Sequence, residues 1–136
     1  MALQTLFEVD SVNHPVELVL AQRLEEKALP AKGRAFARQL VSGVLEHRQR
    51  LDSIISDIAT DWPVEQVAVI DRNILRIAVF EITVYGQTPV KVAINEAVEL
   101  AKLFANDSSR RFVNGVLGTL VSRHGLAAVG RGKTTL

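Results

Sequence analysis

Two consecutive arginines, Arg110 and Arg111, begin a stretch whose apolar residues recur every three or four positions. This spacing indicates an amphipathic helix with both arginines in its first turn. The free N–H groups and positive dipole end of that turn favour an anion, and two guanidinium groups would strengthen a phosphate site. Phe112 offers a ring on which a nucleobase can stack, a contact of about 1–3 kcal/mol. A pair of arginines is nevertheless common on any surface, so the pair alone favours an ordinary surface position over an RNA contact. A core position at the start of the apolar stripe explains Phe112 as well as base stacking does.

The remaining polar groups do not form a catalytic or metal-binding pattern. Asn95, Glu96 and Glu99 lie close together, but a di-metal helix bundle also requires histidine three residues after glutamate, and the three histidines are far apart. The chain has no cysteine and no glycine-rich phosphate-binding loop. We therefore predict no enzyme activity, no metal and no cofactor.

Composition limits the class of protein. A chain of 136 residues with 48% hydrophobic residues is long enough for one domain with a single core. Its 16 basic and 15 acidic residues give no overall cationic field, which by itself argues against RNA binding. No apolar run of about 18 residues and no signal-peptide pattern occurs, so we expect a cytoplasmic protein without a membrane partner.

The stretch from Thr88 to Leu120 is expected to position the arginines as two helices joined by a short polar turn. Thr88 and Pro89 are suited to begin the first helix. One of Asp107, Ser108 and Ser109 is expected to cap the second. Gly115 and Gly118 lie on one flank of that second helix, where the missing side chains would let another backbone approach.

Further helices are expected before this pair, at residues 1–10, 16–28, 31–59 and 67–82. The third of these is one helix or two, with Gly43 as its weakest point. Glu81 falls on the apolar arc of the fourth, where a buried carboxylate must be hydrogen-bonded or protonated, and we expect it to hold helices together. The prediction is an all-α fold of about seven helices in two packed sub-bundles, forming one domain over residues 1–125, with a disordered tail at 126–136.

Four stretches together resemble the NusB family of bacterial transcription antitermination factors: PVKVAINEAVELAKLF, RRFVNGVL, IDRNILRIAVFEI and ALQTLFEVD. The resemblance covers about residues 2 to 122. It implies an all-helical, NusB-like protein without catalytic activity, a monomer or homodimer. It also implies binding to the boxA element of nascent RNA together with NusE, a small-subunit ribosomal protein, within the transcription elongation complex. In that family the first helix begins about a dozen residues earlier, in an arginine-rich segment that this sequence lacks.

The same resemblance implies site residues. It places RNA contacts on the first helix at Gln4 and Phe7, on the helix at 67–82 at Arg76, and at the start of the last helix at Arg111 and Phe112. The preference of a first helical turn for an anion adds Arg110 to this predicted set. Asp71 matches an acidic position on the NusE side, although an aspartate that pairs two helices would look the same. The alternative is a helical docking domain without RNA binding, similar to the region that precedes the catalytic domain of ribosomal-RNA cytosine methyltransferases.

Overall fold

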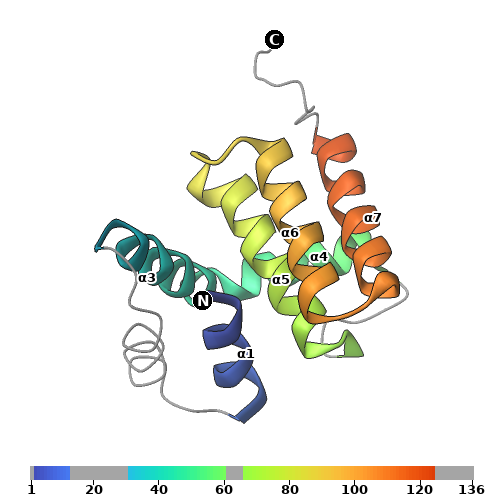
Figure 1. Cartoon of the computed structure of the whole chain (residues 1–136). Helices are drawn as coiled ribbons and strands as arrows, with labels where there is room; N and C mark the ends of the chain where they lie inside the picture. Colours follow the sequence, from blue (N-terminus) through green and yellow to red (C-terminus); the bar gives the residue numbers. More distant parts are fainter. Residues whose placement is uncertain (1, 13–30, 61–65, 125–136) are drawn as a thin grey trace.

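A computed structural model of the chain describes residues 2–12, 31–60 and 66–124. Within these ranges all regular structure is helical: α1 (Ala2–Val12), α3 (Ala31–Glu46), α4 (Arg48–Ile58), α5 (Val69–Phe80), the π-helical segment η2 (Glu81–Tyr85), α6 (Val90–Phe104) and α7 (Asp107–His124) (Figure 1). The predicted all-α class is confirmed. The helix expected at residues 16–28 and the tail at 126–136 lie outside the described residues.

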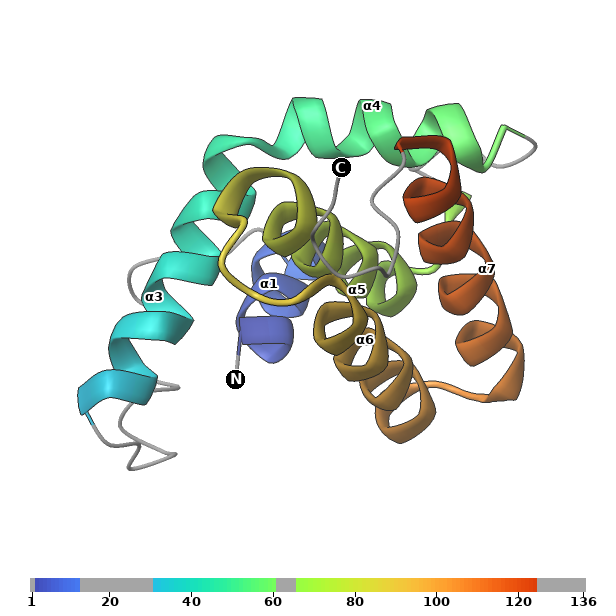
Figure 2. The same cartoon turned by 90° about the horizontal axis from the view of Figure 1, so that it is seen from above.

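Helix α5 is the centre of the fold. It contacts α1, α3, α4, α6 and α7, and every residue from Asn73 to Phe80 is buried. Helices α1 and α3 lie on one side of α5, the hairpin of α6 and α7 lies on the other, and α4 runs along the back (Figures 1 and 2). The two groups correspond to the predicted sub-bundles, and both depend on α5 for their packing.

The long pattern at residues 31–59 forms two helices, with the break at His47 and not at Gly43. Gly43 lies inside α3, and the ring of Phe80 packs directly over it. A Cβ at this position would lie 2.1 Å from Cζ of Phe80. Gly43 therefore permits a close approach between α3 and α5 and does not end the helix.

The helix predicted at residues 67–82 is present as α5, which passes directly into η2. Gly86 closes this segment with a left-handed φ of 70° and donates its N–H to the carbonyl of Glu81. Glu81 itself is only 5% exposed, and it accepts a hydrogen bond of 2.8 Å from Oγ1 of Thr88. Thr88 therefore holds Glu81 and does not cap α6, whose N-cap residue Pro89 has no side-chain cap.

The residue that caps α7 differs from the prediction. Oδ1 of Asn106 accepts the N–H of Ser109 at 2.8 Å, so Asn106 is the cap and none of the three residues after it. The prediction that another backbone approaches Gly115 and Gly118 is also wrong for the described part of the chain. A Cβ at either glycine would meet nothing within 4 Å, and both lie on the exposed face of α7.

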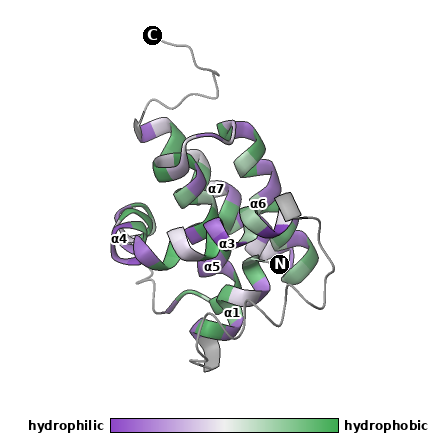
Figure 3. Cartoon of the chain, turned by 90° about the vertical axis from the view of Figure 1, so that its left-hand side faces the viewer, coloured by the Kyte–Doolittle hydropathy of each residue, from purple (hydrophilic) through white to green (hydrophobic). Residues whose placement is uncertain are grey.

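Hydrophobic and hydrophilic residues alternate around the helices instead of separating into whole helices of one kind (Figure 3). This is the pattern of helices that bury one side and expose the other. None of the helices in the described part of the chain combines the length and the apolar character needed to cross a bilayer.

Candidate functional site

Two neighbouring residues of α5 bring the end of α1 and the start of α7 together. Arg72 donates from Nε and Nη2 to the carboxylate of Asp10 at 2.7 and 2.9 Å. Asp71, one position earlier, accepts a hydrogen bond of 3.1 Å from Oγ of Ser109. The last turns of α1 and the first turn of α7 therefore lie at the same end of α5 (Figure 1). We call the predicted residues on these two helices the α1/α7 surface: Gln4, Phe7, Arg110, Arg111 and Phe112.

On α7 the surface is basic and accessible. Arg111 is exposed and has no ion pair with the described residues. Nε of Arg110 lies 3.6 Å from Oδ1 of Asp107, a solvated pair one helical turn apart. Pairs of this kind contribute at most about 1 kcal/mol, so they do not prevent Arg110 from turning to a phosphate. Phe112 is partly buried against the core, which leaves part of its ring for a second contact.

On α1 the two predicted residues differ. Phe7 is 37% exposed, a large fraction for an aromatic side chain that could have packed inward. Gln4 is partly buried, and its Oε1 atom is enclosed without a hydrogen-bond partner among the described residues. A buried unpaired carbonyl oxygen costs about 1–3 kcal/mol. Because Phe7 is exposed and Gln4 is partly buried, Phe7 is the one of these two α1 residues that offers surface to a partner.

Arg76 lies in the interior and not on the surface. It is 3% exposed. Its Nε and Nη2 donate to the two oxygens of Asp52 at 2.7 and 3.0 Å, and its Nη1 donates to Asp10 at 3.0 Å. A guanidinium enclosed in this way does not face RNA, so the predicted direct contact is corrected. Arg76 instead positions α1 and α4 against α5.

The acidic partners of this network were not predicted. Asp10 and Asp52 are separated from Arg76 by 66 and 24 residues, and no local pattern connects them. One signal was present: from Ile74 to Phe80 every residue other than Arg76 is apolar, which indicates a segment buried on several sides and hence a buried, paired arginine. Arg48 adds a partly exposed third guanidinium, 3.5 Å from Asp10.

Asp71 is 8% exposed, which matches the helix-pairing alternative more closely than an open docking residue. One carboxylate oxygen bonds Ser109, and the other is buried without a partner in the described structure. A partner protein would reach Asp71 only if the adjoining starts of α5 and α7 moved.

The pKa of Asp10 is about 2, below the usual 3.8. Burial alone would raise it, but hydrogen bonds from Arg72 and Asn73 and the charges of Arg76 and Arg72 outweigh the burial. Because the pKa is lower in the folded state, the ionised form of Asp10 stabilises the fold above about pH 4. This contribution is lost as the pH falls through about 2.

We expect a loss of about 1 kcal/mol of unfolding free energy from this group between pH 5 and pH 2, after allowance for solvent screening around the outer arginines. Urea unfolding at pH 5, 3 and 2 measures it. The Asp10→Asn variant is expected to start less stable and to show a smaller decline with acid. An equal decline in both proteins would contradict the assignment to Asp10.

Comparison with known proteins gives one consistent family. The NusB family model matches residues 1–122. The transcription antitermination protein NusB of Roseiflexus castenholzii is 53% identical over 91% of this chain and 89% of its own length. The protein of the same name from Dehalococcoides mccartyi strain CBDB1 is 48% identical over 88% of this chain and 84% of its own length.

Solved structures agree on the fold. NusB of T. maritima superposes with a TM-score of 0.82 at 30% identity, over 89% of this chain and 85% of that one. A chain from the crystal structure of the antitermination factors NusB and NusE with double-stranded RNA also gives a TM-score of 0.82. It is 24% identical over 90% of this chain and 91% of that one, so it supports the fold alone.

Proposed function

The chain belongs to the NusB family, and on this premise we propose that it is a transcription antitermination factor that binds boxA-type RNA together with NusE. The observation that carries the proposal is the α1/α7 surface: hydrogen bonds at Asp10 and Ser109 hold the helix that carries the exposed Phe7 and the basic start of α7 at the same end of α5. We assign the protein no catalytic role and place it in the cytoplasm, where nascent RNA is made.

Each part of the surface has a task in this proposal. Arg110 and Arg111 contact phosphates at the positive end of the α7 dipole. Phe7 and the accessible part of Phe112 stack on unpaired bases. The net charge of the whole chain is only +1, so the electrostatic contribution to affinity is small. NusE supplies a second RNA-binding surface, and the bound complex gains affinity through effective concentration.

The cooperative part of this mechanism is tested by an anisotropy titration of boxA RNA with the protein, alone and with NusE. We expect weak binding by the chain alone and at least about tenfold tighter binding with NusE, because linking two sites makes the second contact intramolecular. Equal affinity in both titrations would contradict the mechanism.

The residue assignment is tested by the double variant Arg110→Glu/Arg111→Glu. We expect at least about a tenfold loss of RNA affinity and a shallower salt dependence. A complex that makes two fewer phosphate contacts releases fewer counterions from the RNA when it forms. The matched control is Arg34→Glu/Arg50→Glu, which makes the same charge change at exposed positions of α3 and α4.

Circular dichroism checks that both double variants keep the fold. Equal loss of RNA binding in both would mean that only total charge matters. Retained RNA binding with lost NusE pairing in the Arg110→Glu/Arg111→Glu variant would favour the protein-docking alternative.

A further inference from the structure

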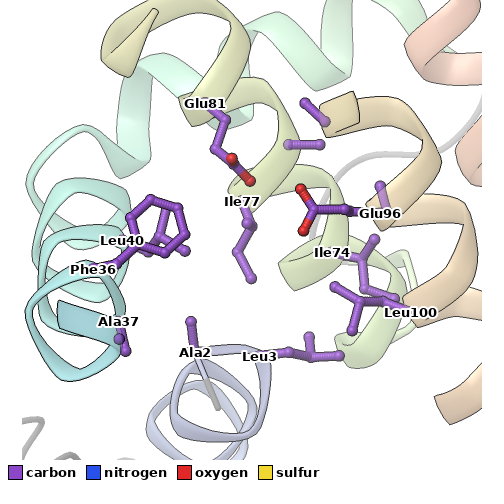
Figure 4. Close-up of a pocket in the computed structure, with 14 residues that line it drawn as sticks. Ala2, Leu3, Phe36, Ala37, Leu40, Ile74, Ile77, Glu81, Glu96 and Leu100 are labelled. Atoms are coloured by element: carbon purple, nitrogen blue, oxygen red, sulfur yellow. The ribbon is translucent and has the colours of Figure 1, made fainter. Parts of the chain in front are cut away.

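A pocket of about 310 Å³ lies between the two halves of the fold, and none of the residues of the α1/α7 surface lines it. Its walls come from α1, α3, α5, η2 and α6, and they are almost entirely apolar, with the ring of Phe36 among aliphatic side chains (Figure 4). Leu3, Leu40 and Ile77 are representative: each is nearly or fully buried and lines the pocket. The volume is many times that of one water molecule and falls at the lower end of ligand pockets.

Two carboxylates break this apolar lining. Glu81 enters from η2 and Glu96 from α6, and their carboxylate groups point toward one another at one end of the pocket (Figure 4). Glu81 is 5% exposed, whereas Glu96 is exposed at the mouth. Among the described residues that line the pocket there is no lysine, arginine or histidine.

No basic side chain among the described lining residues balances these two carboxylates. Burial raises the pKa of Glu81, the hydrogen bond from Thr88 lowers it, and the charge of Glu96 raises it again, with a net upward shift. The hydrogen bond from Thr88 occupies Oε2. A buried carboxylate beside a second carboxylate is unfavourable in water-poor surroundings, and a cation placed between them relieves both the burial and the repulsion.

We propose that this pocket binds an organic cation, an aliphatic chain that ends in an ammonium or guanidinium group. The chain lies against Leu3, Leu40 and Ile77, and the cationic group lies between Glu81 and Glu96. An anionic ligand meets two like charges, and a neutral apolar ligand adds no ion pair to either carboxylate, so the lining favours a cation over each. The inference goes beyond the RNA-binding function and uses none of its residues.

The test is an NMR titration of the isotope-labelled protein with n-hexylamine, and with n-hexanol and n-hexanoate as probes of the same chain length. We expect saturable amide shifts in α6 and η2 with hexylamine, binding at least about tenfold weaker for hexanol, and no binding of hexanoate, because only the amine adds an ion pair to the apolar contact. Equal affinity for amine and alcohol, or no saturable shift with the amine, would overturn the proposal.

Glu96→Gln is the informative variant, because Glu96 is exposed and its replacement leaves the buried Glu81–Thr88 hydrogen bond in place. We expect it to weaken hexylamine binding at least about tenfold. Glu99→Gln is the matched control: it removes the same charge from an exposed position on the same helix that does not line the pocket. An equal effect of both variants would show a general charge effect and refute a site.

The cation has two sources of the same chemistry, a free amine and a basic side chain of a polypeptide. An alanine-rich helical peptide with one arginine, compared with the same peptide carrying norleucine, distinguishes them. Tighter binding of the arginine peptide than of hexylamine identifies a polypeptide source, and the reverse order identifies a small molecule. The Arg110→Glu/Arg111→Glu variant is expected to bind hexylamine unchanged, so failure of the RNA proposal and failure of this one are separable.

Discussion

Replacement of Gly43 by alanine is expected to lower the free energy of unfolding by about 2–3 kcal/mol, at the upper end of typical overpacking costs. The new methyl group would lie 2.1 to 2.9 Å from three atoms of the Phe80 ring. That ring is 4% exposed and stacks with Tyr85, with centroids 6.4 Å apart, so it has little room to move. The clash outweighs the gain of about 1 kcal/mol that alanine brings to a helix interior. Thermal or urea unfolding measures the change.

Two controls separate the clash from the helix propensity. Gly115→Ala places the same methyl group on the open face of α7 and is expected to stabilise by up to about 1 kcal/mol. In a Phe80→Leu background, Gly43→Ala is expected to become neutral or stabilising, because the ring that opposes it is gone. A large cost of Gly43→Ala that persists in this background would refute the steric explanation.

Replacement of Arg76 by alanine is expected to have the largest effect, a loss of about 3–5 kcal/mol of unfolding free energy. The variant leaves Asp10 and Asp52 without their central guanidinium, and the Asp10 side chain is only 7% exposed. Asp10 keeps its hydrogen bonds from Arg72 and Asn73, but Asp52 loses both of its hydrogen bonds to Arg76. Breaking a buried ion pair in this way costs more than forming the pair gains. Arg50→Ala, which removes an exposed arginine of α4, is expected to stay within about 0.5 kcal/mol of the parent.

The same position distinguishes a structural arginine from an RNA contact. Arg76→Lys retains the charge but loses the paired hydrogen bonds to Asp52, so it is expected to destabilise less than alanine. Under conditions in which Arg76→Lys is folded, the salt dependence of its RNA binding is expected to match the parent. A salt slope reduced by about 1 in Arg76→Ala or a similar folded variant would mean that Arg76 contacts a phosphate after all.

The ion pairs of Arg76 also bear on RNA binding. Among the described helices α1 packs mainly on α3 and α5, and the carboxylate of Asp10 is a polar link that fixes its end beside Arg72 and Arg76. Loss of that link would release Phe7 from its position relative to α7. RNA binding is therefore expected to fall together with the stability of α1, even when α6 and α7 remain folded.

The sequence alone determined the helical class and the pairing of α6 with α7. Apolar residues spaced by threes and fours, broken by Asn106 and its neighbours, predict helices because helical hydrogen bonds join residues only four apart. The same local information indicated that a carboxylate at Glu81 must find a hydrogen bond. It did not identify Thr88 as the donor, because the geometry of the π-helical segment brings the two together.

Only the tertiary structure decided which side chains are available to a partner. Arg76 and Arg111 are the same residue type on two helices that pack against each other, α5 and α7. Arg76 is enclosed by aspartates from α1 and α4, whereas Arg111 is exposed. Gly43 and Gly115 likewise differ only in whether an aromatic ring lies above them. Exposure and ion pairing depend on how helices distant in the chain pack, and periodicity within one helix carries no information on the identity of its neighbours.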